Sequence, residues 1–258
     1  MRIKGFFWVL SGLLLLFLVA PLLGMFFATS APQLFETVAD DQVRQSIWLT
    51  LGISFATTLL VAVFALPLAY VMARKQFVGK ALVQGLIDLP IVLPHSAAGI
   101  AVLGCLSRDA ALGRLANLVG LNLVGSPFAI GVAMAFVSVP FLVNAARDGF
   151  EAVPVRLEQA AATLGAGPFR IFREVALPLA KPSVVSGLVL MFARGMSEFG
   201  AVVIVAYHPM TTPVLIFDRF NAFGLSYARP VAVLFVVICV AVFILLRFLG
   251  KKDRHVQL

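Results

Sequence analysis

Four ionisable residues stand inside long apolar runs of this sequence and are the first candidates for chemistry: Asp88, His95, Arg194 and Glu198. Each costs roughly 2.5–3.5 kcal/mol at the middle of a membrane helix, so each needs a partner or a wet cavity. Arg194 and Glu198 are four residues apart and would share one face of a helix. Such a pair can serve packing alone, which we favour because buried ion pairs are often structural. Alternatively, Arg194 lends positive potential to a path that opens for an anion.

His95 and Ser96 follow two prolines in the segment DLPIVLPHSAAGIAVL. Pro90 and Pro94 interrupt backbone hydrogen bonding within an apolar run, and such breaks are tolerated where the backbone faces protein or water. His95 and Ser96 would then lie at an irregular point near a pathway. A packed, neutral His95 is the alternative that we favour over a substrate ligand.

The sequence does not indicate an enzyme or a nucleotide-binding protein. A membrane-embedded enzyme needs catalytic groups clustered at one depth, and the spacing of Asp88, His95 and Glu198 suggests no such cluster. Residues 195–200 have the glycine spacing of a phosphate loop, but Ala201 follows where that motif has lysine. The histidines and cysteines lack the spacing of metal ligands or of a disulfide framework: His95, His208, His255, Cys105 and Cys239. We therefore expect no catalytic residue, no metal site and no bound cofactor in this chain.

The composition indicates an integral membrane protein. Of the 258 residues, 61% are hydrophobic and 12% are charged, whereas soluble domains have about 45–50% apolar and about 25% charged residues. The net charge of +8 does not indicate a nucleic-acid partner, because the basic residues are spread between apolar runs and form no dense patch.

Six segments are long enough to cross about 30 Å of hydrocarbon, which takes about 20 apolar residues: 6–28, 46–73, 82–106, 128–147, 183–206 and 230–249. The first could pass for a signal peptide, but its apolar run is longer than the typical 7–15 residues of a cleaved one. We expect it to be retained. The fold predicted is all-α: one polytopic membrane domain, residues 1–258, with six transmembrane helices.

The basic residues predict the orientation of these spans. If the N-terminus is cytoplasmic, 14 Lys and Arg residues fall in cytoplasmic segments and five in outer ones. Because cytoplasmic loops carry the excess of Lys and Arg, both termini and the segment 148–182 are expected in the cytoplasm.

Residues 148–182 form the longest of these cytoplasmic segments. Helical spacing of apolar residues predicts a short helix over 155–164. Gly165 suits a left-handed position after that helix, and Pro168 the first position of a second one. The alanines and phenylalanines suit docking by a partner, although an amphipathic hairpin lying on the membrane surface fits the residues equally well.

The stretch EQAAATLGAGPFRIFREVALP resembles the "EAA" loop of the permeases of ATP-binding-cassette importers. Ala160 and Ala161 match its alanines, Gly165 its glycine, Val175 its aliphatic position, and Leu177 with Pro178 its end. Gln159 stands where that signature has glutamate, with Glu158 one residue earlier, which leaves open which side chain makes the polar contact. The resemblance implies a coupling helix docked on a cytosolic ATPase, through Glu158, Gln159, Ala160, Ala161, Gly165, Phe169, Leu177 and Pro178.

Longer segments, including ARGMSEFGAVVIVAYHPMTTPVLI, resemble the molybdate/tungstate importer permeases, and Arg194 with Glu198–Ala201 is also similar to the wider oxyanion group. The resemblance implies a type I importer permease of the inner membrane that forms a homodimer. Its partners would be two cytosolic ATPases, which bind ATP and Mg, and an external substrate-binding protein. The pathway would lie between the two copies, and the polar residues inside the spans are its candidate lining: Asp88, His95, Ser96, Arg194 and Glu198.

Other readings are a sulfate or thiosulfate permease, or an ion-coupled carrier or channel. The EAA-like loop argues against a carrier, and no inverted repeat is visible. The outer acidic residues Glu36, Asp40 and Asp41 are ordinary solvated charges or, alternatively, dock the binding protein.

Overall fold

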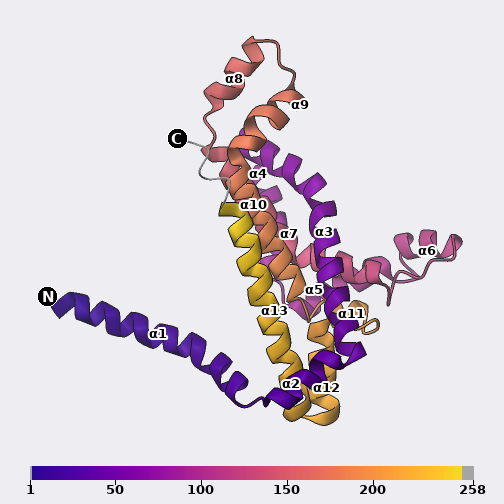
Figure 1. Cartoon of the computed structure of the whole chain (residues 1–258). Coiled ribbons are helices and arrows are strands. Elements are labelled where there is room, and N and C mark those ends of the chain that lie inside the picture. Colours follow the sequence, from indigo (N-terminus) through magenta and orange to yellow (C-terminus); the bar gives the residue numbers. More distant parts are fainter. Residues whose placement is uncertain (1, 252–258) are drawn as a thin grey trace.

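The computed structural model describes residues 2–251, and every regular element among them is a helix (Figure 1). The long helices are α1 (Arg2–Phe27), α3 (Asp41–Arg74), α7 (Pro127–Ala152), α10 (Leu177–Met196) and α13 (Leu225–Lys251). The shorter ones are α2 (Ala31–Ala39), α4 (Lys80–Val92), α5 (His95–Leu106), α6 (Ala111–Leu118), α8 (Val155–Thr163), α9 (Pro168–Ile171), the π-helical turn η1 (Phe172–Ala176), α11 (Val202–Val205) and α12 (Thr212–Phe223). The all-α fold is thereby confirmed. Lys252 and Arg254, two of the charges that predict the orientation, and His255 lie outside the described residues.

Five helical segments among residues 2–251 are long and apolar enough to cross a membrane: Phe6–Phe27, Asp41–Arg74, Pro127–Ala152, Pro168–Met196 and Leu225–Leu246. The helices α4 and α5 make a sixth candidate if the bent pair counts as one span. Each predicted segment therefore corresponds to helices, although two of the six differ in form.

The predicted third span, 82–106, is two helices that meet at an angle of 114°. Pro94 has no amide hydrogen to donate, and it disfavours the helical conformation of the residue before it. Leu93 is accordingly extended, with φ −66° and ψ 136°, and α5 begins directly after Pro94. The break predicted from the prolines is confirmed, but with 13 and 12 residues neither helix reaches the roughly 20 residues of a straight span.

The predicted fifth span, 183–206, is wrong at both ends. A continuous helix runs from Pro168 through η1 to Met196, and residues 197–201 then break the chain before α11. Apolar composition cannot locate this break, because the residues on both sides of it are apolar. Within the helix, η1 is a widened turn with i→i+5 hydrogen bonding. The Phe172 ring of this turn packs against Tyr70 and Phe150, with ring centroids 5.1 and 5.8 Å away.

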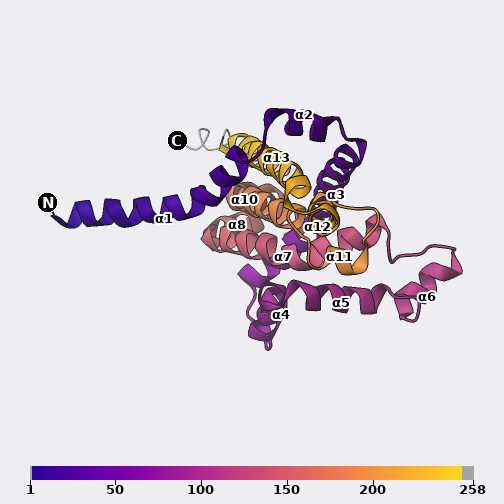
Figure 2. The ribbon, with the colours of Figure 1, turned by 90° about the horizontal axis from the view of Figure 1, so that it is seen from below.

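The bundle is centred on α7, which packs along α3 and α10 (Figures 1 and 2). Small residues allow this close approach. A Cβ added to Gly149 would lie 2.4 Å from the Cβ of Ser183, and one added to Gly187 would lie 3.0 Å from that of Ala145. The core along α7 is correspondingly rich in alanine and valine.

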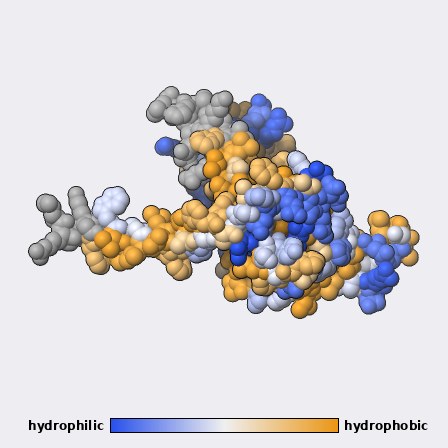
Figure 3. All heavy atoms as spheres, turned by 60° about the horizontal axis from the view of Figure 1, so that its bottom comes forward, coloured by the Kyte–Doolittle hydropathy of each residue, from blue (hydrophilic) through white to orange (hydrophobic). Residues whose placement is uncertain are grey.

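The two ends of the bundle separate the loops that are predicted on opposite sides of the membrane. The helices α8 and α9, the end of α3 and the described end of α13 lie at one end, with α2 and α12 at the other (Figure 1). Figure 3 turns the end with α2 and α12 toward the viewer. Hydrophilic residues gather at this end, while the projecting α1 is hydrophobic. From Phe6 to Phe27 the leucine, valine and aromatic side chains of α1 are exposed, as lipid-facing side chains would be.

Candidate functional site

The predicted coupling segment is a helical hairpin at the α8 end of the bundle (Figure 1). Its first helix, α8, ends at a left-handed glycine: Gly165 has φ +85°. The Gly165 amide donates to the carbonyl of Ala162 and the Ala166 amide to that of Ala161, both at 3.0 Å, which is the Schellman pattern. Pro168 then opens α9. The short helix, its glycine end and the proline start are confirmed.

The tip of this hairpin exposes apolar side chains. Leu164 is 89% exposed and Phe169 is 74% exposed, beside the exposed Gln159 and Ala160. Large exposed apolar side chains at a polar end of the molecule are typical of a surface that a partner covers. Among the other predicted coupling residues, Ala161 is half-buried, Gly165 is exposed, Leu177 packs against the core, and Pro178 is exposed at the start of α10.

Glu158 points in the opposite direction, into the molecule. The residue is 8% exposed, and its carboxylate accepts hydrogen bonds from the Tyr70 hydroxyl at 2.7 Å and from Nε and Nη2 of Arg74 at 2.9 and 2.7 Å. Arg74 Nη2 also donates to the carbonyl of Val153 at 2.9 Å. Glu158 is therefore used inside the chain, and Gln159 is the neighbour that presents a polar side chain to the outside.

Three of the predicted pathway residues lie together where two interrupted helices meet. Arg194, in the last turn of α10, contacts Glu198 Oε2 at 2.7 Å, and its Nη2 lies 3.0 Å from both ring nitrogens of His95. His95 Nδ1 is 3.5 Å from Glu198 Oε2. The Glu198 carboxylate is 1% exposed and also accepts the Ala201 amide at 2.7 Å, whereas the His95 side chain is 51% exposed. Ser96 is exposed beside His95.

Glycine makes the meeting of these two breaks possible. A Cβ added to Gly200 would lie 2.6 Å from the Cβ of His95, and one added to Gly99 would lie 2.9 Å from the Ala201 carbonyl oxygen. Real Cβ atoms essentially never approach that closely. The α4–α5 break and the α10–α11 break therefore pack backbone against backbone.

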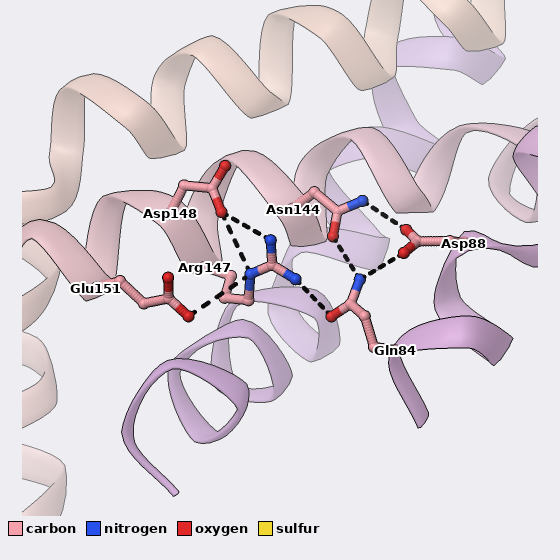
Figure 4. Close-up of polar contacts among 6 residues, drawn as sticks. All are labelled: Gln84, Asp88, Asn144, Arg147, Asp148 and Glu151. Atoms are coloured by element: carbon pink, nitrogen blue, oxygen red, sulfur yellow. Dashed lines mark hydrogen bonds and ion pairs between the residues drawn. The ribbon is translucent and has the colours of Figure 1, made fainter. Parts of the chain in front are cut away.

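Asp88 belongs to a different cluster, between α4 and α7 (Figure 4). Its carboxylate accepts from Asn144 Nδ2 at 2.6 Å and from Gln84 Nε2 at 2.7 Å, and Gln84 Nε2 also donates to Asn144 Oδ1 at 2.9 Å. Arg147 extends the cluster by donating to Gln84 Oε1 at 2.6 Å. The cluster satisfies Asp88 by holding α4 against α7, and the structure does not bring Asp88 to the Arg194 group.

Charge in the His95–Arg194–Glu198 group is balanced within the chain, because the Arg194 guanidinium faces the Glu198 carboxylate. The group offers guanidinium and imidazole donors at a partly exposed point but contains no nucleophile paired with a base. Among residues 2–251, no three His, Cys, Asp or Glu side chains gather as metal ligands. That this chain binds no cofactor remains a prediction.

The outer acidic residues differ in their surroundings. Asp40 caps α3, accepting the amides of Gln42 at 2.8 Å and Val43 at 3.3 Å, and it pairs with Arg219 at 2.6 Å. Burial raises the pKa of the Asp40 carboxyl, but the Arg219 guanidinium and the capped amides outweigh it, so the pKa lies below its usual range. Glu36 and Asp40 border a hollow of about 650 Å³ between α2, α12 and α13. Asp41 pairs with the exposed Arg44.

Some site residues were missed by the sequence reasoning, and each had a signal. Tyr70 and Arg74 are one helical turn apart at the end of a span, but a basic residue at a cytoplasmic span end is expected for the orientation alone. Gln84 and Asn144 are uncharged polar residues in apolar helices, and a search restricted to ionisable side chains overlooks them.

Comparison with known proteins gives the following relations. A family described as binding-protein-dependent transport system inner membrane component matches residues 65–254. The chain is 42% identical to the molybdate/tungstate transport system permease protein of Thermococcus kodakarensis, with 96% of each protein covered. It is 44% identical to that of Pyrococcus furiosus, over 95% of this chain and 94% of the relative.

A sulfate transport system permease protein of Salmonella typhimurium is more distant, at 32% identity over 78% of this chain and 74% of the relative. Among solved structures, a bacterial ABC transporter involved in the import of the acidic polysaccharide alginate matches with a TM-score of 0.74 and 17% identity, over 98% of this chain and 100% of that chain. The structural match establishes likeness of fold.

Proposed function

This chain belongs to the family of binding-protein-dependent transport system inner membrane components, and from that premise we propose that it is the permease subunit of an ATP-driven importer of molybdate or tungstate. The observation that carries the substrate class is the 42% identity to the Thermococcus kodakarensis molybdate/tungstate permease over 96% of both proteins. Sulfate is the second candidate, favoured by a relative of lower identity and coverage.

The assembly proposed has two copies of this chain, two cytosolic ATPase subunits that bind ATP and Mg, and an external substrate-binding protein. The exposed Gln159, Leu164 and Phe169 at the hairpin tip support docking of an ATPase there. A chain without a phosphate-loop sequence needs such a partner to use ATP. The hollow bordered by Glu36 and Asp40 is the candidate contact for the binding protein.

One continuous helix connects the docking hairpin to the predicted pathway. The segment Pro168–Met196 has 29 residues, so at 1.5 Å per residue it is about 43 Å long. Phe169 lies near its first end, and Arg194 lies in its last turn. A displacement of the hairpin by the ATPases is therefore delivered directly to the His95–Arg194–Glu198 group.

Arg194 is the residue that suits an oxyanion. Its guanidinium carries five N–H donors in a planar fork, a geometry that matches oxygen anions. In this structure the fork is held by the Glu198 carboxylate and by His95. When the path opens, Arg194 exchanges part of that contact for the passing anion, and Ser96 supplies a neighbouring hydroxyl.

Transport by purified components tests the proposal. The test uses proteoliposomes that contain the permease, with the ATPase on the inner side and the binding protein on the outer side. They should accumulate labelled molybdate or tungstate only when ATP is hydrolysed inside the vesicles. A non-hydrolysable ATP analogue is the control. Accumulation without ATP would instead identify a carrier. Competition with unlabelled sulfate separates the two candidate substrates. If the protein is a sulfate permease, sulfate added at the same concentration as labelled molybdate should suppress molybdate uptake.

A further inference from the structure

We propose that Tyr70, Arg74 and Glu158 form a positioning clamp that ties the docking hairpin to α3, so that one movement of the hairpin drives α3 and α10 together. This inference rests on the proposed function as a permease. It gives Glu158 a role inside the chain instead of at the ATPase surface.

The clamp is built as a buried, fully satisfied ionic contact. The Arg74 and Glu158 side chains are each 10% exposed. Two guanidinium nitrogens and the Tyr70 hydroxyl donate to the carboxylate within 2.7–2.9 Å. Arg74 uses Nη2 again to hold the Val153 carbonyl, just before α8 begins. Arg74 therefore bonds both α8, through Glu158, and the chain just before α8, through Val153. Two contacts at different points fix both the position and the direction of α8 relative to α3.

The hairpin joins the bundle by its two chain connections, to α7 through Val153 and to α10 through η1, and the Phe172 ring of η1 packs against Tyr70 of α3. The clamp adds a charged, hydrogen-bonded contact between α8 itself and α3. At the other end of α3, Thr50 Oγ1 accepts the Thr212 amide at 2.8 Å, where α12 begins. From Thr50 to Arg74 the helix advances by 24 residue steps, or about 36 Å. The clamp therefore gives the hairpin a route to the outer end that is separate from the route along α10.

The exposed face of α8 does not take part in the clamp. Gln159 and Leu164 point outward while Glu158 is buried. Loss of the clamp is therefore expected to leave ATPase docking intact and to weaken only the transmission of movement to α3.

Glu158→Gln and Arg74→Met test this in the reconstituted transporter. Both variants should still copurify with the ATPase, and the ATP hydrolysed per anion transported should rise by about threefold to thirtyfold, the range typical of residues that carry coupling. The double variant Arg74→Glu with Glu158→Arg restores an opposite-charge pair and should recover part of the coupling. The matched control is Glu174→Gln, which removes an exposed carboxylate of the same segment that bonds Arg170 at 2.7 Å, and it should leave the ratio unchanged.

Two results would overturn the proposal. One is a wild-type ratio of ATP to anion in Glu158→Gln and Arg74→Met. The other is loss of ATPase copurification in well-folded variants, which would place Glu158 in docking. If these variants fail to fold, Tyr70→Phe removes a single hydroxyl, and the ratio should still rise about twofold to threefold; no rise would also overturn the clamp. Failure of the proposed function differs, because the wild-type chain would then show no ATP-dependent uptake.

Discussion

At the scale of single residues, the Glu198 carboxylate is the most deeply buried side chain of the His95–Arg194–Glu198 group. It is 1% exposed, and it is satisfied by the Ala201 amide and by Arg194, each at 2.7 Å. A buried carboxylate that loses its cation is an uncompensated charge. The integrity of the break after α10 therefore depends on Arg194, whatever else Arg194 does for an anion.

Arg194→Ala should lower the free energy of unfolding by roughly 3–5 kcal/mol, because it strands the buried Glu198 carboxylate. The measurement is thermal stability of the detergent-solubilised protein by size-exclusion chromatography after heating. The double variant Arg194→Met with Glu198→Gln leaves no buried charge and should recover most of that stability. Slow anion transport by the stable double variant would place Arg194 in the pathway, whereas normal transport would limit it to packing.

Asp40 gives the outer end a predicted pH dependence. Its pKa is lowered in the folded protein, so its stabilisation is fully present above the unfolded-state value and is lost as the pH falls through the lower folded value. The stability difference between wild type and Asp40→Asn should be largest near pH 7 and should shrink below about pH 4. Hydrogen exchange at the α2–α3 junction measures it.

Asp41→Asn is the control, because the pair between Asp41 and Arg44 is exposed and such pairs contribute roughly 0–1 kcal/mol. A stability difference for Asp40→Asn that stays constant from pH 7 to pH 3 would contradict the assignment.

Ionisable residues inside apolar runs could be recognised from the sequence as site candidates, but the residues that they contact could not be predicted. His95, Arg194 and Glu198 are brought together by two breaks that lie about 100 residues apart in the chain. Glu158 and Gln159 are adjacent and both polar, and the direction of α8 relative to α3 decides which of them is buried.

At the scale of elements, the turn between α8 and α9 fixes how the hairpin presents its tip. Gly165 adopts φ +85°, and the Schellman hydrogen bonds depend on that conformation. A left-handed position costs roughly 1–2 kcal/mol for a residue with a Cβ, and β-branched residues tolerate it least.

Gly165→Val should therefore reorient Leu164 relative to Phe169 and uncouple ATP hydrolysis from transport. The expected result is retained ATPase activity with transport reduced about tenfold or more, since small misplacements of positioned groups have effects of that size. Gly167→Val is the matched control, because Gly167 has an ordinary extended conformation, φ −71°. Normal coupled transport by Gly165→Val would refute the role of this turn.

The ends of α8 and the start of α9 could be predicted because glycine and proline act locally. The prolines of the third span predicted its break for the same reason, although not the 114° angle, which depends on packing against α7 and α11. The break at 197–201 follows no proline and lies between apolar residues. A prediction from apolar composition therefore continued the fifth span through the break.

At the scale of the whole molecule, the positions of loops and helix ends agree with one orientation in the membrane. The hairpin and the end of α3 lie at one end, and α2 and α12 lie at the other. This separation follows from the succession of apolar spans along the sequence, so it could be predicted without knowing any helix contact. The distribution of Lys and Arg adds which end faces the cytoplasm, and that orientation stays a prediction.

Cysteine labelling checks that topology directly. In a background with Cys105→Ser and Cys239→Ala, a membrane-impermeant maleimide should label Gln159→Cys only from the cytoplasmic side. Glu36→Cys should react only from the outer side. Both positions are exposed in the folded chain, so in membranes that contain the permease without its ATPase and binding protein, burial cannot account for a missing signal. The reverse pattern would invalidate the orientation and, with it, the proposed coupling to cytosolic ATPases.

The widened turn η1 has a consequence for how the hairpin is aimed. A π-helical turn holds one residue more than the α-helical path it replaces, and each residue of an α-helix advances the chain by about 100° and 1.5 Å. Deleting one residue from the α-helical part of α10 would thus swing Phe169 and the whole of α8 by about 100° around the α10 axis. Deleting one residue from Phe172–Ala176 would instead let the widened turn close into an ordinary α-helical turn, so the hairpin would keep its direction. Phe172–Ala176 is therefore the stretch where this helix can lose one residue without turning the docking tip away from its partner.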